Sequence, residues 1–407
     1  MNKAIKVIFP VLAAASILAS CTPETAGGGS GTINLLIWED ASNIETLEKI
    51  AEYFKADYKR AYPLAPDIEF TFEARNEAAA VSDLLTIGES GEGPDIAAIT
   101  SDTLATAVRS NLVAPVSYDE EVKNCFEPEV VSNVTIDGDV YAYPITAESQ
   151  TIMYNKEEVT DPSIFDSFES LLASGESIAW DVNDEDCAYY CFGFLTDADL
   201  FGEDGTDASS LNLDTDKGSK NLLDAFTTYR SAITPAAPET AAALLAAGEV
   251  AGIVTSPFLY QTLANSIGAE NVGLHKLPTI NGEEMRPFSG YKEYVVSSYS
   301  SQPAIAQMFA NYIVNPDSQI ERMLDLNYLP TRYDGDVNEF LTDNEILETY
   351  KASYDLSKPM PTIEQMGYYW SPMINFCKAM WNAGTSLTLE QVKTGLQEVE
   401  DTIKGNN

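Results

Sequence analysis

The residue whose chemistry is clearest from its surroundings is Cys21, the first of five cysteines in the chain. Lys3 and Lys6 precede an uncharged apolar run, Val7 to Leu18, and two small residues then lead into the cysteine. This layout predicts a bacterial export signal over residues 1–20, too short for a membrane-spanning helix. A cysteine at the cleavage point can be acylated, and each buried CH₂ then adds about 0.8 kcal/mol of membrane affinity. We therefore predict lipidation at Cys21; the alternative is an ordinary cleaved signal with a chance cysteine.

The other nucleophilic and metal-binding side chains are sparse. Cys125, Cys187, Cys191 and Cys377 allow two disulfides with three connectivities, and free buried thiols are equally compatible with the sequence. His275 is the single histidine and lies in an apolar, strand-like run. One histidine and no paired Cys-x-x-Cys motif argue against a zinc site and against a Ser-His-Asp triad. We expect no metal, no cofactor and no catalytic residues.

Two alternatives involve carboxylates. A glycosidase needs two of them at a fixed separation, but 63 acidic residues make any such pair uninformative. The stretch from Asn212 to Gly218 partly resembles a calcium loop, yet its glycine comes one place late and no glutamate ends it. The simpler interpretation of Asp216 is an N-cap for a helix that begins at Lys217.

The charge balance excludes two classes of partner. The formal net charge of the chain is −40. Nucleic-acid binding depends on basic groups that meet phosphates, and adhesion to anionic lipid needs basic clusters. We therefore predict no nucleic-acid partner and a membrane contact only through the lipid anchor.

The first part of the folded chain alternates strand and helix patterns. Apolar runs predict strands at 33–38, 68–72 and 95–99, and helical spacing predicts helices at 42–58, 81–87 and 103–110. Ser42 with Glu45 fits a capping box. This rhythm predicts an open, mainly parallel α/β sheet, which binds ligands outside the carboxyl ends of its strands.

The remainder predicts a second unit. Strands are expected at 252–255, 272–277 and 294–298, and helices at 217–229, 240–247, 304–314, 368–381 and 387–403. Residues 21–31 are rich in glycine and predict a flexible tether. The residues that follow exceed what one core usually supports, so we expect two domains.

Short blocks along the chain resemble one family, the extracellular solute-binding proteins of sugar ABC transporters, and within it the maltose- and maltodextrin-binding proteins most closely. The resemblance runs from Ile33 to Lys404 and rests on the order of the blocks, each weak alone. The blocks are Leu35-Leu36-Ile37-Trp38, Gly93-Pro94-Asp95-Ile96, Tyr143-Pro144-Ile145 with Glu148, Met153-Tyr154-Asn155-Lys156, Gly248-Glu249, Leu277-Pro278, Phe288-Ser289-Gly290, and Met360-Pro361 running to Gln365-Met366 and Trp370.

The resemblance implies a two-lobed α/β fold of the periplasmic-binding-protein type, with a mainly parallel sheet in each lobe and a hinge between them. The N-lobe is expected at 32–146 plus 292–340 and the C-lobe at 147–291 plus 341–407. The resemblance also implies a monomeric binding protein and not an enzyme. It places this protein on the outer face of the cytoplasmic membrane or on its periplasmic side. The implied partners are an oligosaccharide, either maltose or maltodextrin or a related sugar, and the permease subunits of the transporter. The alternative ligand is another polar solute.

The resemblance also implies a sugar site between the lobes. Aromatic rings cover the C–H faces of a sugar, while carboxylates accept its hydroxyl protons. The implied ligand-binding residues are Trp370, Phe258, Asp102, Glu148, Tyr189, Tyr190, Glu39, Asp40 and Arg75. Structural roles compete with these: Trp370 and Phe258 fit a core, Asp102 fits a helix cap, and the other charged residues fit a solvated surface. Ile99 stands where a family tryptophan is expected and Phe258 replaces another, which leaves room for a sugar other than maltose.

Overall fold

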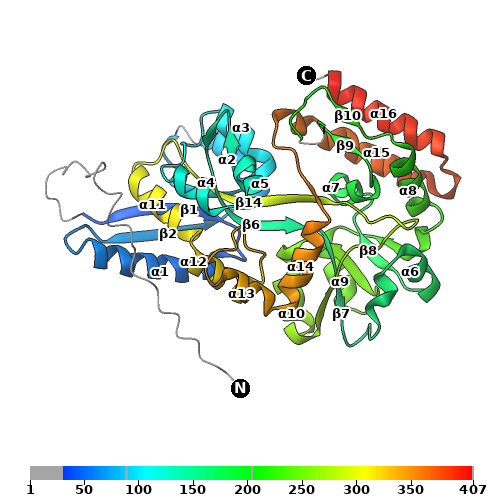
Figure 1. Cartoon of the computed structure of the whole chain (residues 1–407), viewed down its shortest axis with the longest axis horizontal. Coiled ribbons are helices and arrows are strands. Elements are labelled where there is room, and N and C mark those ends of the chain that lie inside the picture. The colour runs from blue at the N-terminus through cyan, green and yellow to red at the C-terminus, as the bar shows by residue number, and fades with distance from the viewer. Residues whose placement is uncertain (1–30, 88–89, 203–204, 406–407) are drawn as a thin grey trace.

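The computed structural model describes residues 31–87, 90–202 and 205–405, which form two α/β lobes side by side (Figure 1). The first lobe is built on a six-stranded sheet. Within it, β1 is parallel to β2 and β3, and β14 is antiparallel to β3 and β6 but parallel to β15. The strands are β1 (Ile33–Glu39), β2 (Ile68–Ala74), β3 (Ile96–Thr100), β6 (Tyr143–Ser149), β14 (Phe288–Val296) and β15 (Lys358–Pro359).

Helices and one small hairpin complete the first lobe (Figure 1). The helices are α1 (Ile44–Ala61), α2 (Glu77–Ile87), α3 (Leu104–Arg109), α4 (Asp119–Cys125), α5 (Pro128–Asn133), α11 (Pro303–Ile313), α12 (Pro316–Leu326) and α13 (Val337–Thr342). The hairpin pairs β4 (Thr135–Ile136) with β5 (Asp139–Val140).

The second lobe is built on a five-stranded sheet. In it, β8 is parallel to β11 and β12, and β7 is antiparallel to β12 and β13. Its strands are β7 (Thr151–Asn155), β8 (Ile178–Trp180), β11 (Ile233–Pro235), β12 (Gly252–Thr255) and β13 (Val272–His275), and a small sheet pairs β9 (Asp199–Leu200) with β10 (Leu211–Asn212). Its helices are α6 (Phe168–Ser174), α7 (Cys187–Cys191), α8 (Asp216–Phe226), α9 (Pro238–Ala246), α10 (Tyr260–Ile267), α15 (Trp370–Ala383) and α16 (Leu389–Gly405). The predicted two-lobed α/β fold class is confirmed.

Two long strands and one helix connect the lobes. The strands β6 and β14 pair antiparallel and run from the first lobe towards the second (Figure 1). Only Gln150 separates the end of β6 from the start of β7 in the second sheet. The helix α14 (Glu345–Asp355) contacts both β6 and β13. The chain therefore passes between the lobes at more than one place, and each lobe is assembled from distant segments.

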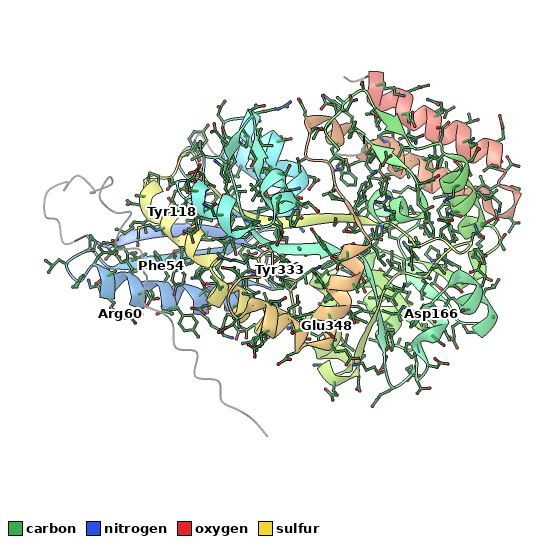
Figure 2. All side chains as sticks on the ribbon, in the orientation of Figure 1. Phe54, Arg60, Tyr118, Asp166, Tyr333 and Glu348 are labelled. Carbon is green, nitrogen blue, oxygen red and sulfur yellow. The ribbon has the colours of Figure 1, made fainter. Side chains whose placement is uncertain are left out.

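The helix α1 has the apolar face that its spacing predicts. Leu47, Ile50 and Phe54 are buried, and Phe54 packs against Phe70 and Phe309 at ring-centroid distances of 6.1 and 5.1 Å. Burying one such side chain contributes about 1.5–3 kcal/mol. Figure 2 shows Phe54 within the first lobe. The predicted capping box is wrong, because the helix begins one residue later, after Asn43.

Two further predictions need correction. Thr215, and not Asp216, caps α8: the Thr215 hydroxyl accepts a hydrogen bond from the Gly218 backbone N–H, while Asp216 pairs with Lys393. The strand predicted at 294–298 begins earlier, at Phe288. The apolar pattern missed this part because Lys292 and Glu293 interrupt it, although both are buried.

Cys21 and residues 1–20 lie outside the described residues. Over the ranges that the structure describes, no helix is both long enough and apolar enough to cross a membrane. Across the same residues, no group of histidine, cysteine and acidic side chains has the arrangement of a metal site. Cys125, Cys187, Cys191 and Cys377 are free thiols in this structure.

Candidate ligand-binding site

Three aromatic rings from distant parts of the chain meet where β14 begins. The ring of Phe288 lies 6.3 Å from that of Tyr189 in a stacked arrangement, and 6.3 Å from that of Trp370 at an angle of 68°. Tyr189 belongs to α7, and Trp370 is the first residue of α15. Both are half-buried, whereas Phe288 is fully buried. The fold thus brings two of the predicted ligand residues to either side of one core phenylalanine.

Contacts beneath this group fix its position. Phe192 stacks on Phe288 with centroids 3.8 Å apart and planes 8° apart. The hydroxyl of Tyr369, next to Trp370, donates a hydrogen bond of 3.0 Å to the backbone carbonyl of Ala188. This bond ties the start of α15 to α7, so the rings of Tyr189 and Trp370 are held by rigid elements.

Two predicted carboxylates lie close to this aromatic group. Asp102 sits in the turn Ser101–Thr103 that follows β3, and Glu148 lies near the end of β6. Burial raises the pKa of Tyr189, and the carboxylates of Glu148 and Asp102 raise it further. Both carboxylates are therefore within electrostatic range of the phenol.

Asp102 is not a helix cap here. The N-cap of α3 is Thr103, and it makes no side-chain capping bond. Burial raises the pKa of Asp102 above its ordinary value, while a hydrogen bond with Thr100 lowers it. A partly buried carboxyl group at the carboxyl end of a strand is where open α/β sheets place ligand contacts.

Glu148 belongs to a buried network of charged side chains with Lys292 and Glu77. The ammonium of Lys292 lies 2.6 Å from Oε2 of Glu77 and 3.4 Å from Oε1 of Glu148, and these three side chains are between 6 and 16% exposed. Although burial lowers the pKa of Lys292, Glu148 and Glu77 raise it well above its ordinary value, so the ammonium stays charged. Burial also raises the pKa of Glu77, despite the opposing effect of Lys292.

Glu39 and Asp40 are occupied within the protein. Oε1 of Glu39 accepts hydrogen bonds from the backbone N–H of Asp40 at 2.8 Å and from the amide of Asn43 at 3.0 Å, and its Oε2 accepts one from the Tyr294 hydroxyl. Oδ1 of Asp40 accepts two bonds from Ser42. Glu39 is fully buried, and the amide of Asn43 also reaches Oε1 of Glu77 at 3.3 Å. The structure thus places Glu39 in the ion network and Asp40 in a tight turn.

The other nominated residues have different surroundings. Tyr190 is buried, and its hydroxyl bonds with Thr255. Phe258 lies in the turn Pro257–Leu259 after β12. It is half-buried and packs against the cluster of buried residues that includes the core of the first lobe. Arg75 is exposed, with its guanidinium 5.0 Å from the centre of the Trp38 ring. Of the nine residues, Trp370 and Tyr189 meet at Phe288, and Asp102 and Glu148 lie within electrostatic range of Tyr189.

Sequence reasoning missed Lys292, Glu77 and Phe288 as parts of this site. The signal for Lys292 was present, since a charged residue inside an otherwise apolar strand needs a buried partner. Nothing in the sequence pointed to Glu77 as that partner, because 215 positions separate the two. Phe288 stands out in the sequence only as part of the block Phe288-Ser289-Gly290.

The site offers ring faces and hydrogen-bond acceptors. Among the described residues, Oε1 of Glu148 is a buried oxygen that accepts no hydrogen bond. The Lys292 ammonium lies 3.4 Å from this oxygen and partly offsets its charge. A hydrogen bond to a charged group contributes about 1.5–3 kcal/mol, so a ligand hydroxyl that donates to this carboxylate would be favoured. Rings beside such an acceptor suit a molecule with C–H faces and hydroxyl groups.

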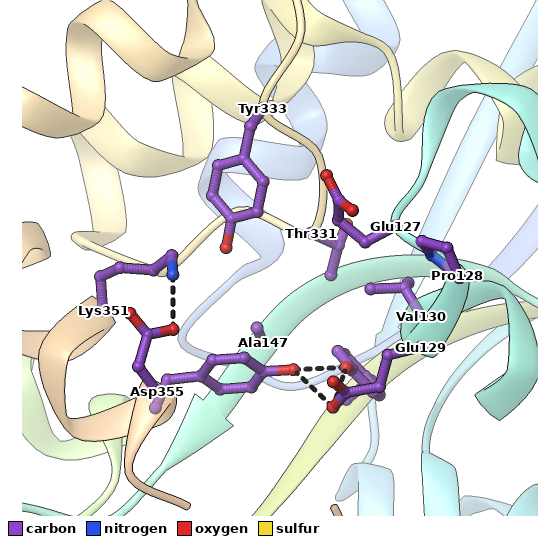
Figure 3. Close-up of a pocket in the computed structure, with 11 residues that line it drawn as sticks. Glu127, Pro128, Glu129, Val130, Ala147, Thr331, Tyr333, Lys351 and Asp355 are labelled. Carbon is purple, nitrogen blue, oxygen red and sulfur yellow. Dashed lines mark hydrogen bonds and ion pairs between the residues drawn. The ribbon is translucent and has the colours of Figure 1, made fainter.

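A cavity of about 400 Å³ lies elsewhere (Figure 3). Successive side chains of a strand point to opposite faces. We call the face of β6 and β14 that carries Glu148 and Lys292 the front face, and the face that carries Ala147 and Tyr291 the back face. Ala147 and Tyr291 line the cavity, so it lies on the back face, and none of the nine nominated residues lines it.

The two α/β lobes, their crossing strands and the convergent rings and carboxylates between them define a binding protein of the two-lobed class. The chain belongs to a family of this class: the model of the bacterial extracellular solute-binding proteins matches residues 49–349. Membership makes the protein a solute-binding protein and not an enzyme, as the sequence predicted.

The chain is similar to several sugar-binding proteins over most of their length. A galactooligosaccharide-binding protein of Bacillus subtilis is 23% identical, over 98% of this chain and 96% of its own. A maltodextrin-binding protein of the same organism is 24% identical, over 89% of each chain. The structure of MalX from Streptococcus pneumoniae in complex with maltopentaose matches with a TM-score of 0.78 at 21% identity, over 92% of this chain and all of that one.

Proposed function

We propose that this protein is the sugar-binding component of an ABC importer. It captures maltose, a maltodextrin or a related oligosaccharide between its lobes and delivers it to a membrane permease. The observation that carries the proposal is that Trp370 and Tyr189 meet at Phe288 while Asp102 and Glu148 lie within electrostatic range of Tyr189. Its ring faces suit the C–H faces of a sugar, and its carboxylates suit the hydroxyl rim.

The named relatives support a sugar but not one sugar. One relative is named for galactooligosaccharides and another for maltodextrin, at nearly equal identity. Two positions favour a ligand other than maltose, since Ile99 and Phe258 stand where the family resemblance expects tryptophan. A galactose-containing or other non-maltose oligosaccharide is therefore the second candidate ligand.

The lobes are proposed to close on the ligand by bending at the crossing strands, a motion known for periplasmic binding proteins. The proposed boundaries are 32–146 plus 292–340 and 147–291 plus 341–407. The passage from β6 to β7 within one residue supports a boundary near 147, and the pairing of β14 with both β3 and β6 supports one near 292.

The protein is proposed to work as a monomer on a lipid anchor at Cys21, on the outer face of the cytoplasmic membrane or on its periplasmic side. An anchor would keep the binding protein at high effective concentration beside the permease. Expression of a Cys21→Ala variant tests the anchor: the variant should leave the membrane fraction, and retention there would contradict lipidation. Size-exclusion chromatography with light scattering tests the monomer.

A thermal-shift screen of the full chain tests the sugar. It should include maltose, maltotriose, maltotetraose and galactooligosaccharides, with sorbitol as a polar control. A ligand that binds only the folded protein stabilises it by about 2.7 kcal/mol when the ligand concentration is a hundredfold above Kd. Stabilisation by one oligosaccharide series and not by sorbitol supports the proposal and names the ligand. Stabilisation by no carbohydrate contradicts it.

A further inference from the structure

The cavity on the back face is built from parts of both sides of the lobe junction. Figure 3 shows Tyr333 and Lys351 on one side of it and Glu129 and Val130 on the other. Glu129 and Val130 belong to α5, and Lys351 belongs to α14. Its volume of about 400 Å³ falls within the range of small-molecule sites, about 300–1,000 Å³.

Three tyrosine rings and a carboxylate form the walls of this back-face pocket. The hydroxyls of Tyr291 and Tyr354 bond with each other, and each also approaches Oε1 of Glu129, at 3.3 and 3.4 Å. The third ring is that of Tyr333. Because Tyr291 and Tyr354 direct hydroxyl groups at each other and at Glu129, the pocket presents a fixed carboxylate and ring surface rather than free hydrogen-bond donors.

The charges that line the pocket are unbalanced. Its lining has three carboxylates, those of Glu127, Glu129 and Asp355, and one ammonium, that of Lys351. Lys351 forms an ion pair with Asp355. No other basic residue lines the pocket, so none of the lining residues forms an ion pair with Glu127 or Glu129. Burial raises the pKa of Tyr333, and Asp355, Glu127 and Glu129 raise it further, so all three carboxylates act on this ring.

The protein already places one cation in this environment. The ammonium of Lys351 lies 5.7 Å from the centre of the Tyr333 ring while it pairs with Asp355. A cation within about 6 Å of an aromatic face is attracted by the ring quadrupole, by about 0.5–1 kcal/mol when exposed and about 2 when desolvated. Tyr354, also from α14, reaches across to α5, where its hydroxyl lies 3.4 Å from Oε1 of Glu129, and no lysine among the lining residues pairs with Glu129.

We infer that the back-face pocket is a second ligand site, separate from the sugar site, that binds a small organic cation of the quaternary-ammonium type. The cation would occupy the space between Tyr333, Tyr354 and Glu129, with Glu127 at the rim. Aromatic faces combined with carboxylates are the groups that recognise such ligands. A neutral sugar would gain less here, because the charge surplus favours a positive ligand over a neutral one.

The test compares two molecules of the same shape. Choline and its neutral isostere 3,3-dimethyl-1-butanol differ in the charge of one central atom. Isothermal titration calorimetry of the full chain at low, constant ionic strength should show one choline site. The isostere should bind at least about tenfold more weakly, which corresponds to the loss of roughly 1.4 kcal/mol of cation–π and Coulombic attraction.

Variants of the lining residues test whether the calorimetric signal comes from choline bound in this pocket. Tyr333→Leu and Glu129→Gln should each weaken choline binding by about fivefold or more, in line with the loss of about 1 kcal/mol. The matched controls are Tyr299→Leu and Glu390→Gln, which change exposed residues outside the pocket and should leave choline affinity unchanged. Glu129 is exposed, so Glu129→Gln should fold normally, and circular dichroism confirms this for each variant.

Three results would overturn the inference. The first is no choline binding by the folded full chain. The second is equal affinity for choline and the isostere, which would show that charge plays no part. The third is choline binding that persists in both pocket variants, or that maltotriose displaces in competition, because either would place the cation elsewhere. The first two results and the behaviour of the two pocket variants do not depend on whether the front-face site binds sugar, and the maltotriose competition applies once that site is shown to bind it.

Discussion

The two faces of the crossing strands β6 and β14 differ in how they treat charge. On the front face, the ion pair between Lys292 and Glu77 is 8 and 6% exposed. On the back face, the ion pair between Lys351 and Asp355 is 32 and 54% exposed. A buried pair that loses one partner leaves an uncompensated charge and costs about 3–5 kcal/mol, whereas an exposed pair is worth about 0–1 kcal/mol. The front-face ion pair therefore contributes to the stability of the fold, whereas the back-face ion pair contributes little to it.

The comparison suggests a division of labour. On the front face, Lys292 pairs with Glu77 and Glu148, and the carboxylate of Glu148 lies within electrostatic range of Tyr189. The back face keeps unbalanced carboxylates beside aromatic rings around an existing cavity. The first three predictions below change one face and use the other as the control, and the fourth compares a variant with the original protein.

The largest effect should come from the two lysines. Lys292→Met removes the cation between Glu77 and Glu148 and should lower the free energy of unfolding by about 3–5 kcal/mol. Lys351→Met should lower it by less than about 1 kcal/mol. Urea denaturation measures both. Equal losses in the free energy of unfolding would show that the two ion pairs contribute equally to stability, which would contradict the comparison. The double variant Lys292→Met with Glu77→Gln should recover part of the loss, because one orphaned charge is then removed.

The second effect concerns ligand selectivity. Trp370→Ala should weaken oligosaccharide affinity at least about tenfold, a loss of about 1.4 kcal/mol, because a sugar face loses its aromatic cover. Tyr333→Leu on the back face should leave that affinity unchanged. Calorimetry with the sugar found in the screen measures both. Unchanged affinity in a folded Trp370→Ala protein would make Trp370 a core residue.

A smaller effect is expected from the carboxylates. Glu148→Gln replaces a charged acceptor by a neutral one of the same shape, which should weaken sugar binding by about fivefold, or roughly 1 kcal/mol. Glu129→Gln on the back face is the matched control and should not change it. A reversed pattern, with Glu129→Gln the more damaging, would assign the sugar to the back-face cavity.

The smallest effect is a pH dependence at Asp102. Burial raises its folded-state pKa above the ordinary 3.8, so the folded protein holds this proton more tightly than the unfolded chain. The stability that Asp102 contributes is then fully present below its ordinary pKa and is lost as pH rises through the raised one. Asp102→Asn should therefore lose less stability than the original protein between acidic and neutral pH. Thermal melts at both pH values measure the difference, and parallel curves would contradict it.

The site could be predicted only in part. The positions of Asp102 and Glu148 followed from strand patterns and family blocks, because the carboxyl ends of strands meet at a sheet edge. Glu39 fitted the same rule, yet its carboxylate is taken up by Asn43 and Tyr294. A rule based on strand ends gives the place of a side chain but not its hydrogen-bond partners.

The sequence by itself determined the α/β class, the apolar face of α1 and the two-lobed family. These follow from hydrophobic periodicity and from the order of short blocks, which are properties of neighbouring residues. Only the tertiary structure decided that Lys292 meets Glu77, that Phe288 joins Tyr189 to Trp370, and that three tyrosines enclose a second cavity. These contacts join residues far apart in the chain, and the register of β14 with β6 and β3 sets which side chain of each strand reaches which face.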